Sequence, residues 1–206
     1  MFPFIDTETT GRVNFERPAS DECQPDMIEL SAALFTENKR LVQAISTLVT
    51  CPRPEGWRIE PEAQSVHGIT NEMCAEYGMP PCQCLAILNG MSIAARLTIA
   101  HNVRFDLAVI DTAVTRIGNL IGLRAVTDGP SYCTMKRSAD ICRIPFPDGT
   151  GHKWPKLEEA YQFFTGREFP NAHQGLYDVL ACADLFFELR KDEREAEYIN
   201  HVLEVK

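Results

Sequence analysis

Hydrophobic and polar positions divide the first fifty residues into three strand-like runs. The first starts at Phe2 and becomes polar over residues 6–11, the second covers residues 27–36 and the third covers residues 41–50. β-Branched and aromatic residues favour strands. Only four residues separate the second run from the third, which is the length of a tight turn. We therefore expect the chain to open with an antiparallel meander of three strands.

Beyond residue 60 the apolar positions recur mostly at helical spacing. Thr70 is placed to cap a short helix that begins near Asn71. Short apolar runs at residues 97–100 and 131–135 are candidate strands between longer helical patterns. The pattern predicts helices over residues 82–96, over a stretch whose stripe is Val109, Ile110, Ala113 and Ile117, over residues 156–165, and over a last stretch whose stripe is Leu176, Val179, Leu180, Ala183 and Phe187. Polar or proline-rich stretches at residues 14–26, 52–61 and 143–155 are predicted loops.

The chain contains 206 residues, a length that suits one α/β domain. We find no repeat, no low-complexity tract and no internal boundary before residue 190. Residues 191–206 are charged and carry apolar residues at helical spacing. We expect one domain over residues 1–190, followed by an amphipathic helix at 191–206 that lies on the domain or contacts a partner.

Composition narrows the range of functions. The net charge of −9 argues against a protein that holds nucleic acid on a broad basic surface, although an acidic metal site would itself contribute several of these charges. The eight cysteines include no CxxC pair, which disfavours a structural zinc site. The first residues lack a basic region ahead of an apolar core, and no apolar run predicts a membrane span. We expect a cytoplasmic protein without a membrane partner.

The acidic residues at the end of the first strand carry candidate chemistry. Asp6 and Glu8 are two positions apart, so in a strand they point to the same face. Two carboxylates on one face repel each other unless a cation neutralises them, and hard divalent ions such as Mg²⁺ or Mn²⁺ prefer oxygen ligands. The alternative is a solvated strand end with two unrelated acids. Two further segments have a carboxylate at a predicted helix start, Asp106 in one and Asp178, five residues after His173, in the other.

These three segments together resemble a known family. The stretch Phe4-Ile5-Asp6-Thr7-Glu8-Thr9-Thr10-Gly11 resembles the first motif of the DnaQ-like, or DEDDh, 3′–5′ exonucleases. The segment His101-Asn102-Val103-Arg104-Phe105-Asp106 is similar to the second motif, and His173-Gln174-Gly175-Leu176-Tyr177-Asp178 to the third. Each motif alone is short, but their order and separation agree with the family over nearly the whole chain.

The resemblance implies an RNase H-like α/β fold, with a five-stranded mixed sheet of three antiparallel and two parallel strands and helices on both faces. It also implies two divalent cations, Mg²⁺ or Mn²⁺, held by Asp6, Glu8, Asp106 and Asp178. Asp6 would contact both cations, Glu8 and Asp178 the one that activates water, and Asp106 the other. His173 would be the general base. The first two motifs also contain the candidate substrate-binding residues Thr7, Thr9, Thr10, His101, Asn102 and Phe105.

The activity implied is release of nucleoside 5′-monophosphates from the 3′ end of DNA or RNA, with single strands favoured. Alternatives are a proofreading subunit that acts with a polymerase, and a binding module that has lost catalysis. A polymerase or a second copy of the chain would be the protein partner. His101 and Phe105 also have structural interpretations, as a loop histidine and a core residue. Lys153, Trp154 and Lys156 could contact nucleic acid, or Trp154 could be a packed lid.

Overall fold

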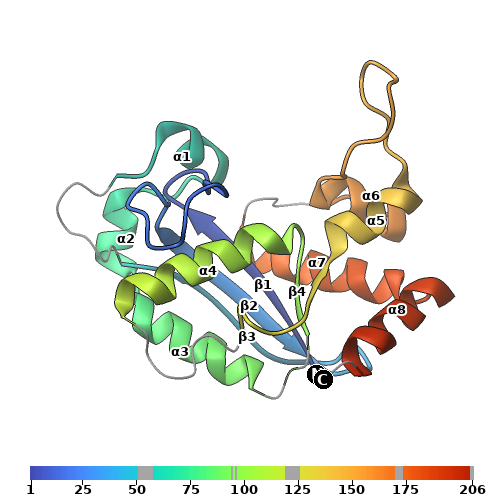
Figure 1. Ribbon diagram of the computed structural model, residues 1–206, viewed down its shortest axis with the longest axis horizontal. Helices are drawn as coiled ribbons and strands as arrows, with labels where there is room; N and C mark the ends of the chain where they lie inside the picture. Colours follow the sequence, from blue (N-terminus) through green and yellow to red (C-terminus); the bar gives the residue numbers. More distant parts are fainter. Residues whose placement is uncertain (51–57, 94, 96, 119–125, 170–173, 205–206) are drawn as a thin grey trace.

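A single five-stranded sheet with helices on both faces forms the body of the protein in the computed structural model (Figure 1). The structure describes residues 1–50, 58–93, 95, 97–118, 126–169 and 174–204. Along the chain, the strands and helices are β1 (Phe2–Thr9), β2 (Met27–Phe35), β3 (Leu41–Leu48), α1 (Pro61–His67), α2 (Asn71–Tyr77), α3 (Pro81–Ser92), β4 (Thr98–Ala100), α4 (Val103–Ile117), β5 (Ser131–Cys133), α5 (Thr134–Cys142), α6 (Leu157–Thr165), α7 (Gly175–Leu189) and α8 (Glu193–Glu204).

The strand order is β3-β2-β1-β4-β5. Strands β1 to β3 form the predicted antiparallel meander, with Phe2 opposite Phe35 and Glu8 opposite Glu29. Strand β4 lies parallel to β1, and β5 lies parallel to β4. The prediction of a mixed sheet with three antiparallel and two parallel strands is therefore confirmed, and the architecture is RNase H-like.

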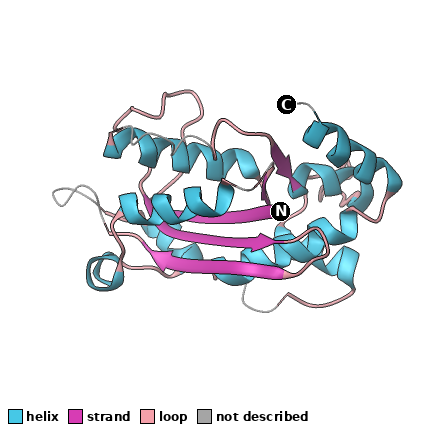
Figure 2. Cartoon of the chain, turned by 90° about the horizontal axis from the view of Figure 1, so that it is seen from below, coloured by secondary structure: helices cyan, strands magenta, loops and turns pink. Residues whose placement is uncertain are grey.

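The two faces of the sheet are covered by different helices (Figure 2). On one face, Phe2 and Phe4 pack edge-to-face against Phe186 of α7. On the other face, Ile5 belongs to the buried cluster that includes residues of α3 and α4. Because side chains alternate along a strand, β1 contributes to both cores and is buried between them. This central position fixes the carboxyl-terminal end of β1 between α4 and α7.

The structure adds two helices to those expected and shortens a third. Helix α1 has no buried residue, so no apolar stripe marks it in the sequence. Helix α5 begins at Thr134, directly after β5, so the predicted strand at 131–135 ends two residues early. Helix α3 starts at Pro81 and ends at Ser92 instead of covering 82–96, because the chain must turn back to enter β4 at Thr98. Proline suits the first helical position, where no amide donor is needed.

The carboxyl-terminal helix α8 packs on the rest of the protein. Ile199 is completely buried, and Val202 and Leu203 contact the same core. Glu195, also buried, accepts hydrogen bonds from Arg137 of α5 and from the hydroxyl of Tyr132 of β5. No helix in the described ranges has the length and apolarity needed to cross a membrane.

Candidate active site

The end of β1 presents an acidic face. Asp6 is paired with Ser31 and Glu8 with Glu29 across the β1–β2 ladder, so all four side chains lie on the same face of the sheet. Ser46 of β3 donates a hydrogen bond to Glu29 at 2.9 Å. The same face is apolar at Phe4, two residues earlier, where α7 covers it. The polar end of β1 therefore begins where the aromatic core stops.

Helix α4 brings the third carboxylate to this point. Asp106 lies in the first turn of α4 and is almost fully buried. Its Oδ1 atom accepts hydrogen bonds from the backbone N–H of Thr7, at 3.0 Å, and from the Thr7 hydroxyl, at 2.9 Å. Thr7 stands between Asp6 and Glu8 in β1, so these two bonds fix Asp106 beside both. The short strand β4, parallel to β1, delivers the chain to this position.

Helix α7 supplies the fourth carboxylate through a close contact with β2. Gly175 is the first residue of α7, and a Cβ atom built on it would lie 2.3 Å from Ser31 Oγ and 3.1 Å from Glu29 Oε2. Only glycine lets the helix start this close to the sheet. Asp178 follows one turn later and is buried. Its charge is among those that raise the pKa of Asp6 and of Glu8, so Asp178 lies close to both.

Burial and mutual repulsion perturb these acids strongly. The pKa of Asp6 is raised well above its ordinary value by burial and then by the charges of Asp106, Glu8, Asp178 and Glu29. Burial, followed by the charges of Glu29, Asp178 and Asp106, raises the pKa of Glu8 to about 8. Burial raises the pKa of Asp106 to about 7, although its hydrogen bonds from Thr7 act in the opposite direction. Perturbed carboxylates of this kind mark functional sites.

The donor set fits divalent cations of the Mg²⁺ or Mn²⁺ type. All the converging groups are carboxylates, which these ions prefer, and a bound cation would relieve the repulsion that raises their pKa values. Within the part of the chain that the structure describes, however, no three His, Cys, Asp or Glu side chains are arranged to hold a metal ion as they stand. The site therefore has the right chemistry, and its side chains must adjust to bind an ion.

The remaining sequence candidates fall into different environments. His173, the candidate general base, lies outside the described residues. Thr9 and Thr10 are buried and shape the turn after β1: the Thr9 hydroxyl donates to the Gly11 carbonyl at 2.7 Å, and the Thr10 hydroxyl accepts from the Asp26 amide at 2.9 Å. Asn102 has a left-handed backbone and precedes the first residue of α4.

His101 is held within the protein on both sides of its ring. Nε2 lies 3.0 Å from the carbonyl oxygen of Pro155, and Nδ1 lies 3.0 Å from Thr134 Oγ1. A carbonyl oxygen only accepts, so Nε2 carries the proton. Burial lowers the pKa of His101 to about 4, which keeps the ring neutral at physiological pH. The geometry agrees with the structural interpretation of this residue, since both ring nitrogens are already engaged.

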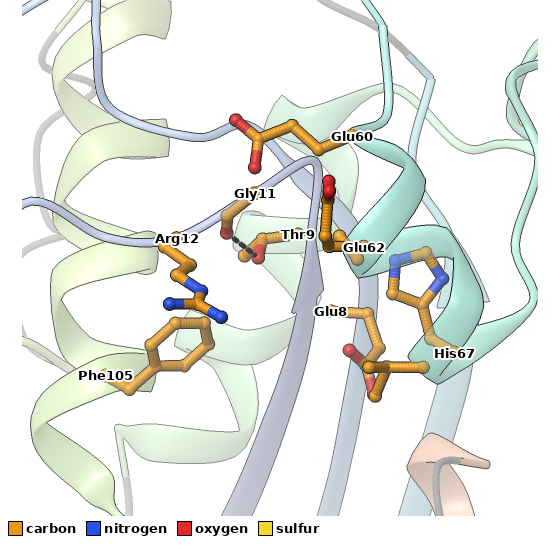
Figure 3. A pocket seen from close by; sticks show the side chains of 10 residues that line it. Glu8, Thr9, Gly11, Arg12, Glu60, Glu62, His67 and Phe105 are labelled. Atoms are coloured by element: carbon orange, nitrogen blue, oxygen red, sulfur yellow. Dashed lines mark hydrogen bonds between the residues drawn. The ribbon is translucent and has the colours of Figure 1, made fainter.

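A cavity of about 250 Å³ opens beside Glu8 (Figure 3). Arg12 and Phe105 lie on one side of it, and Glu62 and His67 of α1 lie on the other. No apolar pattern in the sequence predicts a helix at this rim, because α1 buries none of its residues. The cavity places an aromatic ring, a cation, apolar side chains and two further glutamates, Glu60 and Glu62, next to the acidic end of β1.

The exonuclease family named RNase T matches residues 4–186. Among curated proteins, no sequence matches the chain. The structure is similar to exonuclease I of E. coli in complex with a dA16 oligonucleotide, with a TM-score of 0.72, 18% identity and coverage of 97% of this chain and 43% of that one. It is also similar to exonuclease X in complex with 5′ overhanging duplex DNA, with a TM-score of 0.62, 21% identity and coverage of 98% and 99%.

The chain thus spans less than half the length of exonuclease I and almost the full length of exonuclease X. At these identities the two structures show a shared fold. The family match is broader, since it begins within β1 and ends within α7, and so includes all four carboxylates and their elements. By this match, the chain belongs to the RNase T/DnaQ-like family of exonucleases.

Proposed function

We propose that the protein is a metal-dependent 3′–5′ exonuclease that removes nucleoside 5′-monophosphates one at a time from the 3′ end of single-stranded nucleic acid. The observation that carries this proposal is the convergence of Asp6, Glu8, Asp106 and Asp178, from three separate elements, at the end of β1. A phosphodiester is anionic and would be repelled by these groups alone. Carboxylates gathered in this way serve phosphoryl chemistry only when cations lie between them and the substrate.

Asp6, Glu8, Asp106 and Asp178 would hold two divalent cations. When bound, these ions neutralise the phosphate and lower the pKa of the attacking water. The chain itself orients the ligands: Thr7 fixes Asp106 with two hydrogen bonds, and Gly175 lets α7 bring Asp178 close. His173 would accept the proton of the attacking water, since a histidine with an ordinary pKa can do so near neutral pH.

The cavity beside Glu8 would take the terminal nucleoside. Phe105 and Val66 offer apolar contact to a base or sugar, and the guanidinium of Arg12 offers a positive charge beside a phosphate. Its volume of about 250 Å³ suits one nucleoside better than a longer segment. Helix α1 lines this cavity next to Glu8, so a strand that continued past the carboxylates in this direction would meet α1, which favours cleavage at a chain end. This geometry supports an exonuclease over an endonuclease.

Two alternatives remain to be compared. A proofreading subunit would need a polymerase contact, for which the stripe at residues 191–206 was the candidate, but Ile199 of α8 is buried in this domain. A binding module without catalysis would not need four carboxylates at one point. Purified protein should therefore release mononucleotides from single strands with Mg²⁺ or Mn²⁺ and without a partner. Tight binding of single strands without any hydrolysis, in several metals, would favour the binding module.

A further inference from the structure

A second cavity, of about 520 Å³, lies between α4, β5, α5 and α8. In Figure 1, α5 and α8 are at the same end of the molecule, and α4 runs across the sheet towards it. The polar residues among those that line this cavity are Arg104, Ser131, Cys133, Lys136, Arg137 and Tyr198. None of the described side chains lining it is acidic, although the protein as a whole has a net charge of −9. The site is therefore a local concentration of positive charge on an acidic protein.

One of its three cations is part of the framework. Arg137 forms a two-point ion pair with the buried Glu195, through Nε at 2.8 Å and Nη2 at 2.5 Å. Its guanidinium also lies over the ring of Tyr198, 4.0 Å from the centroid. These contacts fix the wall formed by α5 and α8 and neutralise the charge of Arg137.

The other two cations keep their charge available. Arg104 and Lys136 are both exposed, and neither forms an ion pair with any residue that the structure describes. Each lies over an aromatic ring instead: Arg104 is 4.1 Å from the centroid of Phe15, and Lys136 is 5.7 Å from that of Trp154. An aromatic ring positions a cation without cancelling its charge.

The same two rings are open to solvent. Phe15 is 47% exposed and Trp154 is 62% exposed, values unusual for large aromatic side chains. Exposed aromatic rings beside unpaired cations are the features that bind single-stranded nucleic acid without sequence preference, because bases stack on the rings and phosphates meet the cations. By contrast, Lys153 pairs with Glu159 at 2.5 Å and Lys156 with Glu158 at 3.5 Å. The two lysines that the sequence suggested as nucleic-acid contacts thus each have an acidic partner, unlike Arg104 and Lys136 among the described residues.

We propose that this cavity binds the backbone and bases of a single strand upstream of its 3′ end, with Arg104 and Lys136 in the cavity wall and the rings of Phe15 and Trp154 beside these two cations. The inference rests on the proposed function, which places the 3′ end at the carboxylates. Trp154 directly precedes Pro155, whose carbonyl oxygen lies 3.0 Å from Nε2 of His101, the residue that follows β4. Because β4 lies parallel to β1, this surface is at the same end of the sheet as Asp6 and Glu8. A strand held there would present its 3′ end to the carboxylates while its body remains on the cationic surface.

Equilibrium binding of a fluorescent single-stranded 10-mer to metal-free protein tests this proposal independently of catalysis. Each phosphate contact contributes about 0.7 to the slope of log K against log salt for single strands. Arg104→Ala and Lys136→Ala should each reduce the slope by about 0.7. Trp154→Ala should weaken binding by roughly 5- to 100-fold, the usual range for loss of base stacking. All three positions are exposed, so the variants should fold.

Arg40→Ala is the matched control. Arg40 is an exposed cation in the β2–β3 turn, at the end of the sheet opposite to Asp6 and Glu8, and it forms no ion pair within the described ranges. Its loss changes the net charge equally. The slope of log K against log salt for Arg40→Ala should equal that of wild type. In hydrolysis assays, the loss of kcat/KM in Arg104→Ala and Lys136→Ala should be larger for a 10-mer than for a dinucleotide. Wild-type slopes in both variants, or a loss equal to that of Arg40→Ala, would overturn the inference. Absence of hydrolysis in wild-type protein would instead count against the proposed function and leave the binding test decisive for the cavity.

Discussion

Asp106 and Thr7 are joined by two hydrogen bonds, although 99 residues separate them in the chain. The Thr7 hydroxyl and its backbone N–H both donate to Asp106 Oδ1, at 2.9 and 3.0 Å. One bond depends on the side chain and the other on the strand itself. The Thr7 hydroxyl therefore fixes the orientation of the Asp106 carboxylate, whose approximate position is already set by the fold.

Thr7→Val should keep the fold and the backbone bond but remove the hydroxyl bond. Groups that orient a metal ligand typically contribute 10- to 100-fold to metal affinity or activity, so we expect a loss in that range. Thr47→Val makes the same change on β3, in line with Thr7 across Leu30 of β2, and should have no such effect. Titration of Mn²⁺ into both variants provides the measurement. Equal affinities in Thr7→Val and wild type would show that the hydroxyl does not support Asp106 as a ligand.

The raised pKa values predict how the metal-free protein responds to pH. Glu8, with a pKa of about 8, and Asp106, with a pKa of about 7, favour their protonated forms in the folded state. The stability that this protonation provides is complete below the ordinary carboxyl pKa and is lost as pH rises through 7 to 8. In EDTA, Tm should therefore fall between pH 5 and pH 8.5. Saturating Mg²⁺ should reverse much of this fall, because at a hundredfold excess over Kd each bound ion adds about 2.7 kcal/mol to the free energy of unfolding.

Glu8→Gln should weaken this pH dependence. It should stabilise the metal-free protein at pH 8.5 by on the order of 2–4 kcal/mol, since one pKa unit corresponds to about 1.4 kcal/mol. The same substitution should reduce hydrolysis, because it removes a proposed metal ligand. Glu37→Gln, at an exposed position between β2 and β3, is the control and should leave both properties unchanged. A parallel pH profile for Glu8→Gln and wild type would contradict the assignment of Glu8 to the repelling cluster.

Gly175→Ala tests the close contact between α7 and β2. Its new Cβ would lie 2.3 Å from Ser31 Oγ, so the start of α7 must move and take Asp178 with it. Displacement of a catalytic group by about 1 Å can reduce the rate by about 100-fold. Adding Ser31→Gly should restore part of the activity by making room for the methyl group. Gly90→Ala, inside α3 with nothing within 4 Å, should be neutral or stabilising by about 0.5–1 kcal/mol.

His173→Ala separates the proposed general base from the metal ligands. We expect metal affinity to stay close to that of wild type and kcat to fall by roughly 10²- to 10⁴-fold. The loss should appear in kcat more than in KM, and the acid limb of the pH–rate profile should disappear. Asp178→Ala should instead weaken metal binding as well as the rate. His152→Ala, at an exposed position of the loop after α5, serves as the control. Retention of the acid limb in His173→Ala would show that another group accepts the proton.

The sequence could predict the meander and the acidic end of β1 because both depend on local spacing. Asp6 and Glu8 are two residues apart in a strand, and the helices α4 and α7 have clear apolar stripes. Glu29 could not be found in this way. Its position opposite Glu8 depends on the register of β1 against β2, which no local pattern determines.

The surfaces around the site could not be predicted from the sequence either. Helix α1 forms one wall of the nucleoside cavity but buries none of its own residues, so it has no apolar signature. Among the basic residues, composition cannot distinguish paired from unpaired cations. Lys153 and Lys156 form ion pairs with nearby glutamates, whereas Arg104 and Lys136 lie over the rings of Phe15 and Trp154, which are distant from them in the sequence.

The central claim is tested most directly by the products that purified protein releases from a single-stranded oligonucleotide labelled at its 5′ end. With Mg²⁺ or Mn²⁺, we predict shortening by one nucleotide at a time from the 3′ end, with 5′-monophosphates as products. Asp6→Asn should abolish the reaction in a folded protein, EDTA should stop it, and a closed circular strand should survive. Cleavage of the circle at a rate comparable with the linear strand, or undiminished hydrolysis by Asp6→Asn, would contradict the assignment of a 3′–5′ exonuclease site to these carboxylates.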